Sequence, residues 1–386
     1  MYPYAVREGP SHRLSALTKR LAIASPSASM NAHPRGNGPP KSIKATMRAQ
    51  QYDPADQKLH LNKVEIPKPN ESEILVKVVG ASLCHSDCLT FDPDLVMNKE
   101  VKVPTTIGHE ATGIITEVGK QVRQFEKGDA VGFLASSGCF ECDACTTWSS
   151  VGCPQGLKAQ GFTCDGYFQE YVVVDARSAV KLPASLDVAS SAPLCCAGVT
   201  AYNAIKQCQL TPGKWLAVIG AGGVGQMGVQ YAKAMGLNVI AVDIDGGQLD
   251  AAKMAGADYT FNPELCPTYA DDIKIVTEHG VDAAVSFAPS EKAYDDMPGM
   301  IRWGGLLMVV GVVDGPLTIE PLDIIFKRYV IKTACNGTVR TLEECISFSA
   351  EHSIKPFVEF IGLEDLPQAI EMMEAGKLRK RVCVKF

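Results

Sequence analysis

The stretch LAVIGAGGVGQMGVQYAKAMGLNVIAVD, residues 216–243, decides the fold of this chain. It begins with an apolar run from Leu216 to Gly220 that is typical of a buried strand. A glycine-rich turn follows, and an amphipathic helical pattern then runs to Met235. A second apolar run, Val239 to Asp243, completes the unit. Strand, glycine turn, helix and strand in this order predict two parallel strands joined by a helix.

The glycine turn has the spacing G-x-G-x-x-G, which lets a pyrophosphate approach the positive end of a helix. Asp243 lies 23 residues after Gly220, where a carboxylate accepts hydrogen bonds from ribose hydroxyls and repels a 2′-phosphate. No Lys or Arg follows it until Lys253. A turn needed only for packing is the alternative. The pattern favours a dinucleotide site for NAD, formed by Gly220, Gly222, Gly223, Val224, Gly225 and Asp243.

Working outward, the sequence predicts two kinds of domain. Downstream, apolar strands at Val281 to Phe287 and Leu306 to Val312 alternate with helical stretches, which indicates a doubly wound parallel sheet. Upstream, short β-rich runs separated by Gly and Pro turns predict a partly barrel-shaped β domain. These runs cover residues 73–79, 113–118, 130–133 and 169–174, and the chain ends in a short strand at 381–386. The fold class is therefore α/β.

Fourteen cysteines do not follow the spacing of a secreted disulfide framework. Four of them, spaced C-x2-C-x2-C-x7-C, can surround one tetrahedral Zn²⁺ with no open position, which predicts a structural site. A cluster of buried or redox-active cysteines is the alternative. The four residues are Cys139, Cys142, Cys145 and Cys153.

A second set of candidate ligands is scattered along the chain. Cys84 follows a predicted strand, His109 comes later beside Glu110, and Cys196 lies just ahead of the parallel-sheet domain. Two Cys and one His leave the fourth position of a Zn²⁺ ion open, as catalysis requires. Spacing alone does not join these segments, and Cys195 is an alternative to Cys196.

Composition narrows the possible functions. The chain has 386 residues and a net charge of −6, which argues against a general nucleic-acid binder. It has no apolar run near the roughly 18 residues needed to span a membrane. Residues 1–46 carry a net charge of +6 and predict a disordered basic extension, with a transit peptide as the alternative. A cytoplasmic location is expected, or the mitochondrial matrix if the extension is a targeting segment.

Together these motifs resemble the zinc-dependent alcohol dehydrogenases of the medium-chain dehydrogenase/reductase superfamily, over residues 47–386. The resemblance also rests on the segments GHEATGIITEVG (108–119) and CAGVTAY (196–202). It implies a GroES-like catalytic domain with a structural zinc loop at 47–195 and a Rossmann NAD-binding domain at 196–330. It implies that residues 331–386 return to the catalytic domain.

The resemblance also implies roles for individual residues. Cys84, His109 and Cys196 match the catalytic zinc ligands, and Glu110 matches a carboxylate that transiently approaches or ligates that metal. Other matching residues form the surroundings of the reaction. They are Ser86, which takes the alcohol proton; Asp87, which orients the histidine ligand; His85, near the pyrophosphate; and Thr200, beside the nicotinamide. Arg340 is a candidate for the cofactor phosphates, although its stretch, Gly337-Thr338-Val339-Arg340, departs from the family's Gly-Asn-Arg pattern.

Several positions depart from the family pattern. A histidine that ends the proton relay is replaced by Leu89, and a lysine near the adenosine ribose is replaced by Gln248. Two tryptophans that narrow the pocket for small alcohols align with Leu95 and Leu134. The smaller leucines predict a wider apolar pocket for alcohols larger than ethanol.

The expected function is reversible hydride transfer between an alcohol and NAD by an enzyme with two Zn²⁺ per chain. The expected partners are a small alcohol or carbonyl compound and further copies of the chain in a homodimer or homotetramer, with no nucleic acid and no membrane. A zinc-free quinone or enoyl reductase of the same superfamily and a catalytically silent binding protein are the alternatives.

Overall fold

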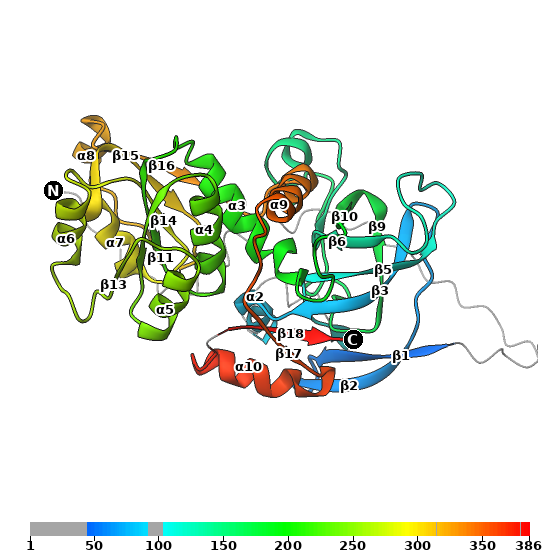
Figure 1. Ribbon diagram of the computed structural model, residues 1–386. Helices are drawn as coiled ribbons and strands as arrows, with labels where there is room; N and C mark the ends of the chain where they lie inside the picture. The colour runs from blue at the N-terminus through cyan, green and yellow to red at the C-terminus, as the bar shows by residue number, and fades with distance from the viewer. Residues whose placement is uncertain (1–44, 92–102, 314, 379) are drawn as a thin grey trace, which may run out of the picture.

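The computed structural model describes residues 45–91, 103–313, 315–378 and 380–386. They form two lobes, one built on a parallel sheet and one on antiparallel sheets (Figure 1). The basic extension and Leu95 lie outside the described residues, apart from Ala45 and Thr46 at the extension's end. No helix in the described parts of the chain is long and apolar enough to cross a membrane.

The Rossmann lobe contains the unit predicted from residues 216–243. Within the described residues its sheet has six strands in the order β13-β12-β11-β14-β15-β16, and every neighbouring pair is parallel. The strands are β11 (Trp215–Ile219), β12 (Asn238–Val242), β13 (Tyr259–Phe261), β14 (Val281–Ser286), β15 (Ile301–Val309) and β16 (Tyr329–Thr333). Its helices are α3 (Ala197–Gln207), α4 (Gly223–Ala234), α5 (Gly246–Met254), α6 (Tyr269–Val276), α7 (Glu291–Met300) and α8 (Pro321–Ile325).

The catalytic lobe is mainly antiparallel. Its larger sheet follows the order β10-β6-β5-β3-β18-β17, with β9 on β3, and a smaller sheet has the order β2-β1-β4. The strands before the Rossmann lobe are β1 (Thr46–Asp53), β2 (Lys58–Glu65), β3 (Glu73–Ser82), β4 (Thr105–Thr106), β5 (Ala111–Val118), β6 (Ala130–Phe133), β7 (Ser136–Ser137), β8 (Lys158–Ala159), β9 (Tyr171–Asp175) and β10 (Ala179–Lys181). The short helical segments are α2 (His85–Cys88), η1 (Leu89–Phe91), η3 (Ala144–Trp148), η4 (Ser150–Gly152), η5 (Ala176–Ser178) and η6 (Ala192–Cys195).

The C-terminal part of the chain crosses back to the catalytic lobe. Helix α9 (Val339–Glu351) lies between the lobes, and α10 (Leu366–Glu374) flanks the β1–β2 hairpin (Figure 1). Strands β17 (Val358–Ile361) and β18 (Arg381–Lys385) join the larger sheet, with η7 (Leu363–Asp365) between them. The expected boundary at residue 330 falls inside β16, because the parallel sheet continues to Thr333.

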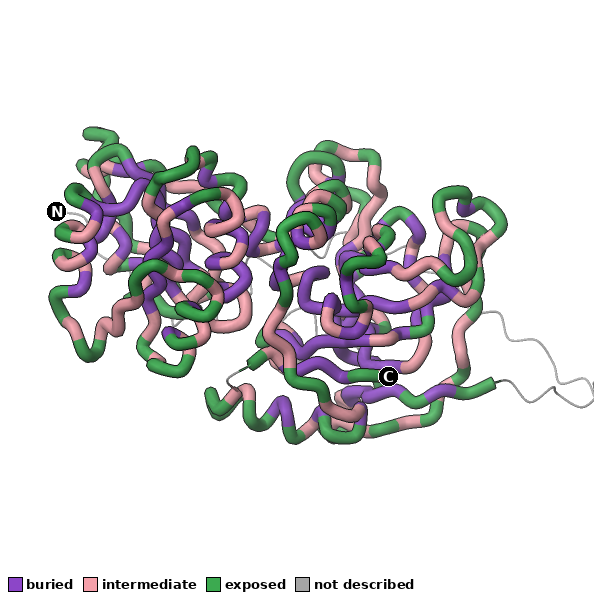
Figure 2. Tube along the Cα trace, in the orientation of Figure 1, coloured by how far each residue is buried: buried purple, intermediate pink, exposed green. Residues whose placement is uncertain are grey.

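Buried apolar residues run through both lobes (Figure 2). One cluster joins them, since it contains Leu134 and Leu182 of the β lobe, Leu216 of β11 and Ile346 of α9. The sequence misplaced one strand of the Rossmann lobe. β15 begins at Ile301 and ends at Val309, earlier than the expected run to Val312, and the chain then passes Gly311, where a Cβ would lie 2.4 Å from the Ala288 carbonyl oxygen.

Candidate active site

Three distant segments bring one cluster of donor atoms together in the catalytic lobe. Cys84 follows β3, His109 and Glu110 precede β5, and Cys196 precedes α3. One ligand atom from each of the four residues lies within 4.8 Å of the others. Sulfur, imidazole nitrogen and carboxylate oxygen at this separation fit a Zn²⁺ ion. The structure therefore joins the segments that spacing alone could not, and it selects Cys196 rather than Cys195.

Asp87 holds two members of this cluster in place. Its Oδ1 lies 2.5 Å from His109 Nδ1, and its Oδ2 accepts a hydrogen bond from the Cys84 backbone N–H at 2.9 Å. Asp87 is completely buried. A proton held on Nδ1 by a carboxylate leaves Nε2 as the metal-binding nitrogen. This geometry supports the positioning role expected for Asp87.

The two thiols of the cluster are not equivalent. The Cys196 thiol donates a hydrogen bond to Cys84, which is the main cause of a pKa of Cys84 well below its usual range. The same contact and burial raise the pKa of Cys196.

Glu110 is held by an arginine that the sequence analysis did not identify. Arg381, the first residue of β18, pairs with both carboxylate oxygens of Glu110, and Ser82 donates to one of them. Burial raises the pKa of Glu110 to about 7, although Arg381 and His109 oppose the shift. A Cβ added at Gly223 would lie 2.9 Å from an Arg381 Nη atom. One guanidinium thus lies against both the metal cluster and the glycine turn.

The second cluster is formed by four cysteines of one loop, as the spacing predicted. Their sulfur atoms also lie within 4.8 Å of one another. The backbone N–H groups of Glu141 and Cys142 donate to Cys139 and lower the pKa of that thiol to about 6. Gly138 is required here, because a Cβ would lie 2.8 Å from Cys145 Sγ.

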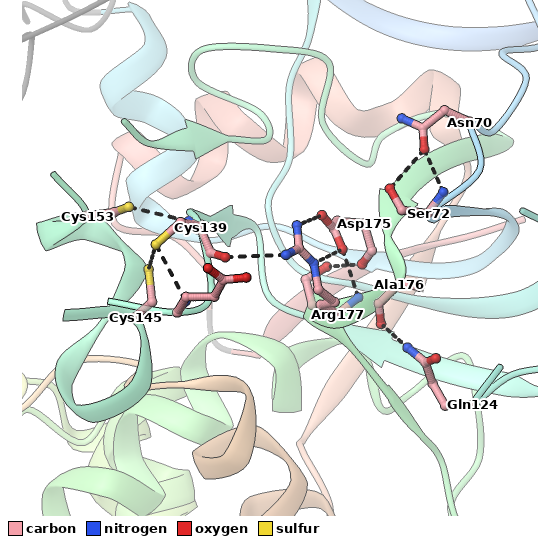
Figure 3. A network of polar contacts seen from close by, with 11 residues as sticks. Asn70, Ser72, Gln124, Cys139, Cys145, Cys153, Asp175, Ala176 and Arg177 are labelled. Carbon is pink, nitrogen blue, oxygen red and sulfur yellow. Dashed lines mark hydrogen bonds and ion pairs between the residues drawn. The ribbon is translucent and has the colours of Figure 1, made fainter. Parts of the chain in front are cut away.

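Arg177 anchors this loop to the β lobe (Figure 3). Its side chain donates to the Cys139 carbonyl oxygen at 3.3 Å and to both oxygens of Asp175. The guanidinium also lies over the Phe140 ring, 4.5 Å from its centroid. The cysteine loop is thus fixed to the end of β9.

The glycine turn is closely packed at one glycine and open at another. A Cβ at Gly225 would lie 1.9 Å from the Gly220 carbonyl oxygen, whereas Gly222 faces open space. Asp243 directly follows β12, and its two oxygens accept from the backbone N–H groups of Ala221 and Asp245 at 2.7 and 2.9 Å. These contacts orient the carboxylate toward the end of the turn.

The remaining predicted residues have diverse surroundings. Ser86 Oγ lies 3.9 Å from Cys84 Sγ. His85 is exposed at the start of α2. Thr200 lies one turn into α3, and its N–H donates to the Cys196 carbonyl oxygen. Arg340 has a side chain that is 85% exposed and pairs with Glu344 at 3.5 Å. Its role at the cofactor phosphates remains a prediction.

The structure places an aromatic ring beside the metal cluster that the sequence analysis missed. The Phe162 ring lies 5.2 Å from the His109 ring, centroid to centroid. Leu134 is 2% exposed and packs in the cluster that joins the lobes. The structure therefore does not place Leu134 as an open wall of the pocket, because its side chain is used for packing between lobes.

Comparison with known proteins finds family models and relatives that agree with the two domains and the metal clusters described above. Residues 70–184 match the family model "Alcohol dehydrogenase GroES-like domain", and residues 223–351 match "Zinc-binding dehydrogenase". An alcohol dehydrogenase of Geobacillus stearothermophilus is 37% identical over 85% of this chain and 96% of its own length. Alcohol dehydrogenase 1 of Caenorhabditis elegans is 32% identical over 89% and 98%. The solved alcohol dehydrogenase of Aeropyrum pernix is 28% identical, covers 88% of this chain and all of its own, and gives a TM-score of 0.79.

The chain belongs to the zinc-type alcohol dehydrogenase family of the medium-chain dehydrogenase/reductase superfamily. It is an alcohol oxidoreductase with a GroES-like and a Rossmann domain, so the expected family, fold class and reaction class are confirmed.

Proposed function

We propose that this enzyme uses NAD(H) and two Zn²⁺ ions per chain to interconvert alcohols with aldehydes or ketones. One observation carries the proposal: Arg381 links the Cys84, His109, Glu110 and Cys196 cluster to the glycine turn. This contact supports a metal bound at the cluster and a dinucleotide bound at the turn lying side by side, as hydride transfer requires. Turnover of NAD⁺ with a panel of alcohols tests the proposal.

The donor sets fit two different zinc roles. Cys84, His109 and Cys196 would hold the catalytic ion, with the Glu110 carboxylate held beside them by Arg381. The four-cysteine loop would hold the structural ion. When bound, the catalytic zinc supplies Lewis acidity at the alcohol oxygen and NAD supplies the hydride acceptor.

The residues of the chain supply orientation and a route for the proton. The resemblance assigns the alcohol proton to Ser86, and the Ser86 Oγ lies 3.9 Å from Cys84 Sγ. Leu89 occupies the next relay position and has no proton-carrying group. We therefore propose that Ser86 would hold the alcohol proton on its way to water, with bound NAD supplying a ribose hydroxyl in place of the missing imidazole. Asp87 holds the His109 ring in one orientation through its contact with Nδ1, which leaves Nε2 directed at the cluster.

The cofactor site is supported by three groups at the edge of the sheet. Arg381 and the start of α4 offer positive charge to the pyrophosphate, with His85 beside it. Asp243 is oriented to accept from the ribose hydroxyls, which favours NAD over NADP. Thr200 lies beside Cys196 and would contact the nicotinamide.

The two alternatives are less well supported. A zinc-free quinone or enoyl reductase has no need of two clusters of metal ligands, and a silent binding protein has no need of the Asp87 contacts that orient His109. Activity with alcohols, but not with quinones or enones, would exclude the quinone or enoyl reductase. Absence of turnover with every alcohol and carbonyl substrate supports the second.

We further propose a substrate larger than ethanol. The support is the Phe162 ring beside His109, which offers an apolar surface to a long or aromatic side chain. Each buried methylene group contributes roughly 0.8 kcal/mol, or about a fourfold change in binding.

We also propose that the enzyme forms a homodimer or homotetramer through the β16 edge. β16 ends the order of the parallel sheet, and α8 packs against it (Figure 1). Exposed apolar side chains of these two elements and of the turn between them include Ile325 at 68%, Phe326 at 63% and Val330 at 51%. A second copy related by a two-fold axis would pair the two edges and cover these side chains.

The two metal sites predict different effects of cysteine substitution. Elemental analysis should find two zinc ions per folded chain. Cys142→Ser should lose one zinc and lower the melting temperature, because a structural site contributes to folding. Cys84→Ser should abolish activity with a smaller change in melting temperature, and Cys266→Ser, outside both clusters, should keep both zinc ions. No more than one zinc in intact wild-type protein contradicts the two-site assignment.

Asp243 predicts the choice of cofactor. Asp243→Ser combined with Ile244→Arg should raise kcat/KM for NADP relative to NAD by at least about tenfold, since removing a negative charge and adding a positive one favours the 2′-phosphate. Asp250→Ser, an exposed residue of α5, is the control and should leave the ratio unchanged. A wild-type enzyme that already prefers NADP would overturn the role given to Asp243.

The Phe162 ring beside His109 predicts how catalytic efficiency changes along a series of alcohols. The value of kcat/KM should rise from ethanol to butanol, hexanol and benzyl alcohol, by up to about fourfold for each buried methylene group. Phe162→Ala should flatten this series and affect benzyl alcohol most. Ethanol as the best substrate would be incompatible with the proposed pocket.

The β16 edge predicts an oligomer that one exposed charge disrupts. Light scattering should give the wild-type protein a mass of two or four times 41.3 kDa. Phe326→Asp and Val330→Asp should each reduce the mass toward that of the monomer, because they bury charge in the contact. Ile275→Asp on α6, 76% exposed, serves as the control and should leave the mass unchanged. A wild-type monomer rules the interface out.

A further inference from the structure

A closed ring of hydrogen bonds connects the glycine turn to the starts of α4 and α5. The ring passes through five residues: Ala221, Gln226, Gln248, Asp245 and Asp243. Three of them belong to the turn, to the end of β12 or to the cap of α5. The other two, Gln226 and Gln248, close the ring through their side chains.

Gln226 is the member that joins the two halves of the ring. Its Nε2 donates to the Ala221 carbonyl oxygen at 3.0 Å and to Gln248 Oε1 at 2.8 Å. An amide nitrogen has two protons, so both are used. The Gln226 residue is 5% exposed, and these donors lie in the protein interior.

The other half of the ring fixes the carboxylate that faces the ribose. The Ala221 N–H donates to Asp243 Oδ2 at 2.7 Å, so the same peptide segment is held by Gln226 on one side and by Asp243 on the other. The Asp245 N–H donates to Asp243 Oδ1 at 2.9 Å. Asp245 then accepts from the Gln248 backbone N–H at 3.1 Å and caps α5. Loss of the Gln226 amide therefore frees Ala221 and α5 to shift relative to Asp243.

We propose that Gln226, through Gln248 and Ala221, is a positioning residue that holds the Asp243 carboxylate against the adenosine ribose of the cofactor. The inference rests on the proposed binding of NAD by Asp243 and adds the group that sets its geometry. Gln226 need not contact the cofactor to act in this way. Its effect should appear in the recognition of the ribose hydroxyls rather than in the chemical step.

The test compares equilibrium binding of NAD⁺ and 2′-deoxy-NAD⁺ by calorimetry. The wild-type protein should prefer NAD⁺ by about two- to tenfold, the value of one hydrogen bond. Gln226→Leu should weaken NAD⁺ binding by a similar factor and leave 2′-deoxy-NAD⁺ nearly unchanged, so that the preference falls toward one. Gln248→Leu should produce the same trend. The double variant should be no weaker than Gln226→Leu, because both residues act through one path.

Gln230 offers a matched control on the same helix. It lies one turn further along α4, and its amide bonds to the backbone of Lys355, outside the ring. Gln230→Leu removes comparable hydrogen bonds and should keep the wild-type preference. If that variant loses the preference equally, the effect is general destabilisation and the inference is wrong.

The remaining outcomes separate this inference from the proposed function. A wild-type protein that does not bind NAD⁺, or that does not distinguish it from 2′-deoxy-NAD⁺, overturns the role of Asp243 itself. A wild-type protein that distinguishes the two, with both glutamine variants unchanged, overturns only the role of Gln226. Independent, additive losses in the double variant show that Gln248 acts directly on the cofactor and also overturn the proposed path.

Discussion

The ion pair between Glu110 and Arg381 is the constraint on which the arrangement of this enzyme depends. The Glu110 side chain is fully buried and that of Arg381 is 8% exposed. Removing one partner of such a pair leaves an unpaired charge in the interior and costs about 3–5 kcal/mol. The pair therefore fixes two segments that are 271 residues apart in the sequence. Arg381 also lies against Gly223, so a single side chain contacts both the metal cluster and the glycine turn.

This constraint gives the path of the chain a physical reason. Arg381 begins β18, and β18 reaches β3 only because the chain crosses back from the Rossmann lobe. Helix α9 is fastened during that crossing, since the Tyr231 hydroxyl of α4 lies 2.9 Å from Ser349 Oγ and 3.2 Å from Cys345 Sγ. The apolar cluster shared by the lobes adds to this contact. The surroundings of the metal cluster are thus built from both ends of the catalytic lobe, since Cys84 and His109 come from its first part and Arg381 from its last strand.

The sites that could be predicted from the sequence are those whose functional residues lie close together along the chain. The cysteine loop and the glycine turn are of this kind, because each motif lies within a short stretch and its residue types leave few other uses. Arg381, Phe162 and Gln226 were missed, because no local pattern distinguishes them and their partners are distant along the chain. Leu134 was assigned to the pocket by alignment, but packing between the lobes determines where its side chain lies. Family resemblance supplied the link between Cys84, His109 and Cys196, and the geometry agrees with it.

The two metal clusters also differ in how far apart their donor residues lie along the sequence. The cysteine loop closes over 15 consecutive residues, so bringing its donors together requires little loop entropy. The other cluster joins residues 84, 109 and 196, and it forms only after β3, β5 and α3 have packed. Its precision therefore comes from the fold: Asp87 fixes His109 and the Cys84 backbone, and Arg381 fixes Glu110. Groups held by their own hydrogen bonds need little reorganisation when charge develops, and this is the condition under which electrostatic stabilisation of a transition state is most effective.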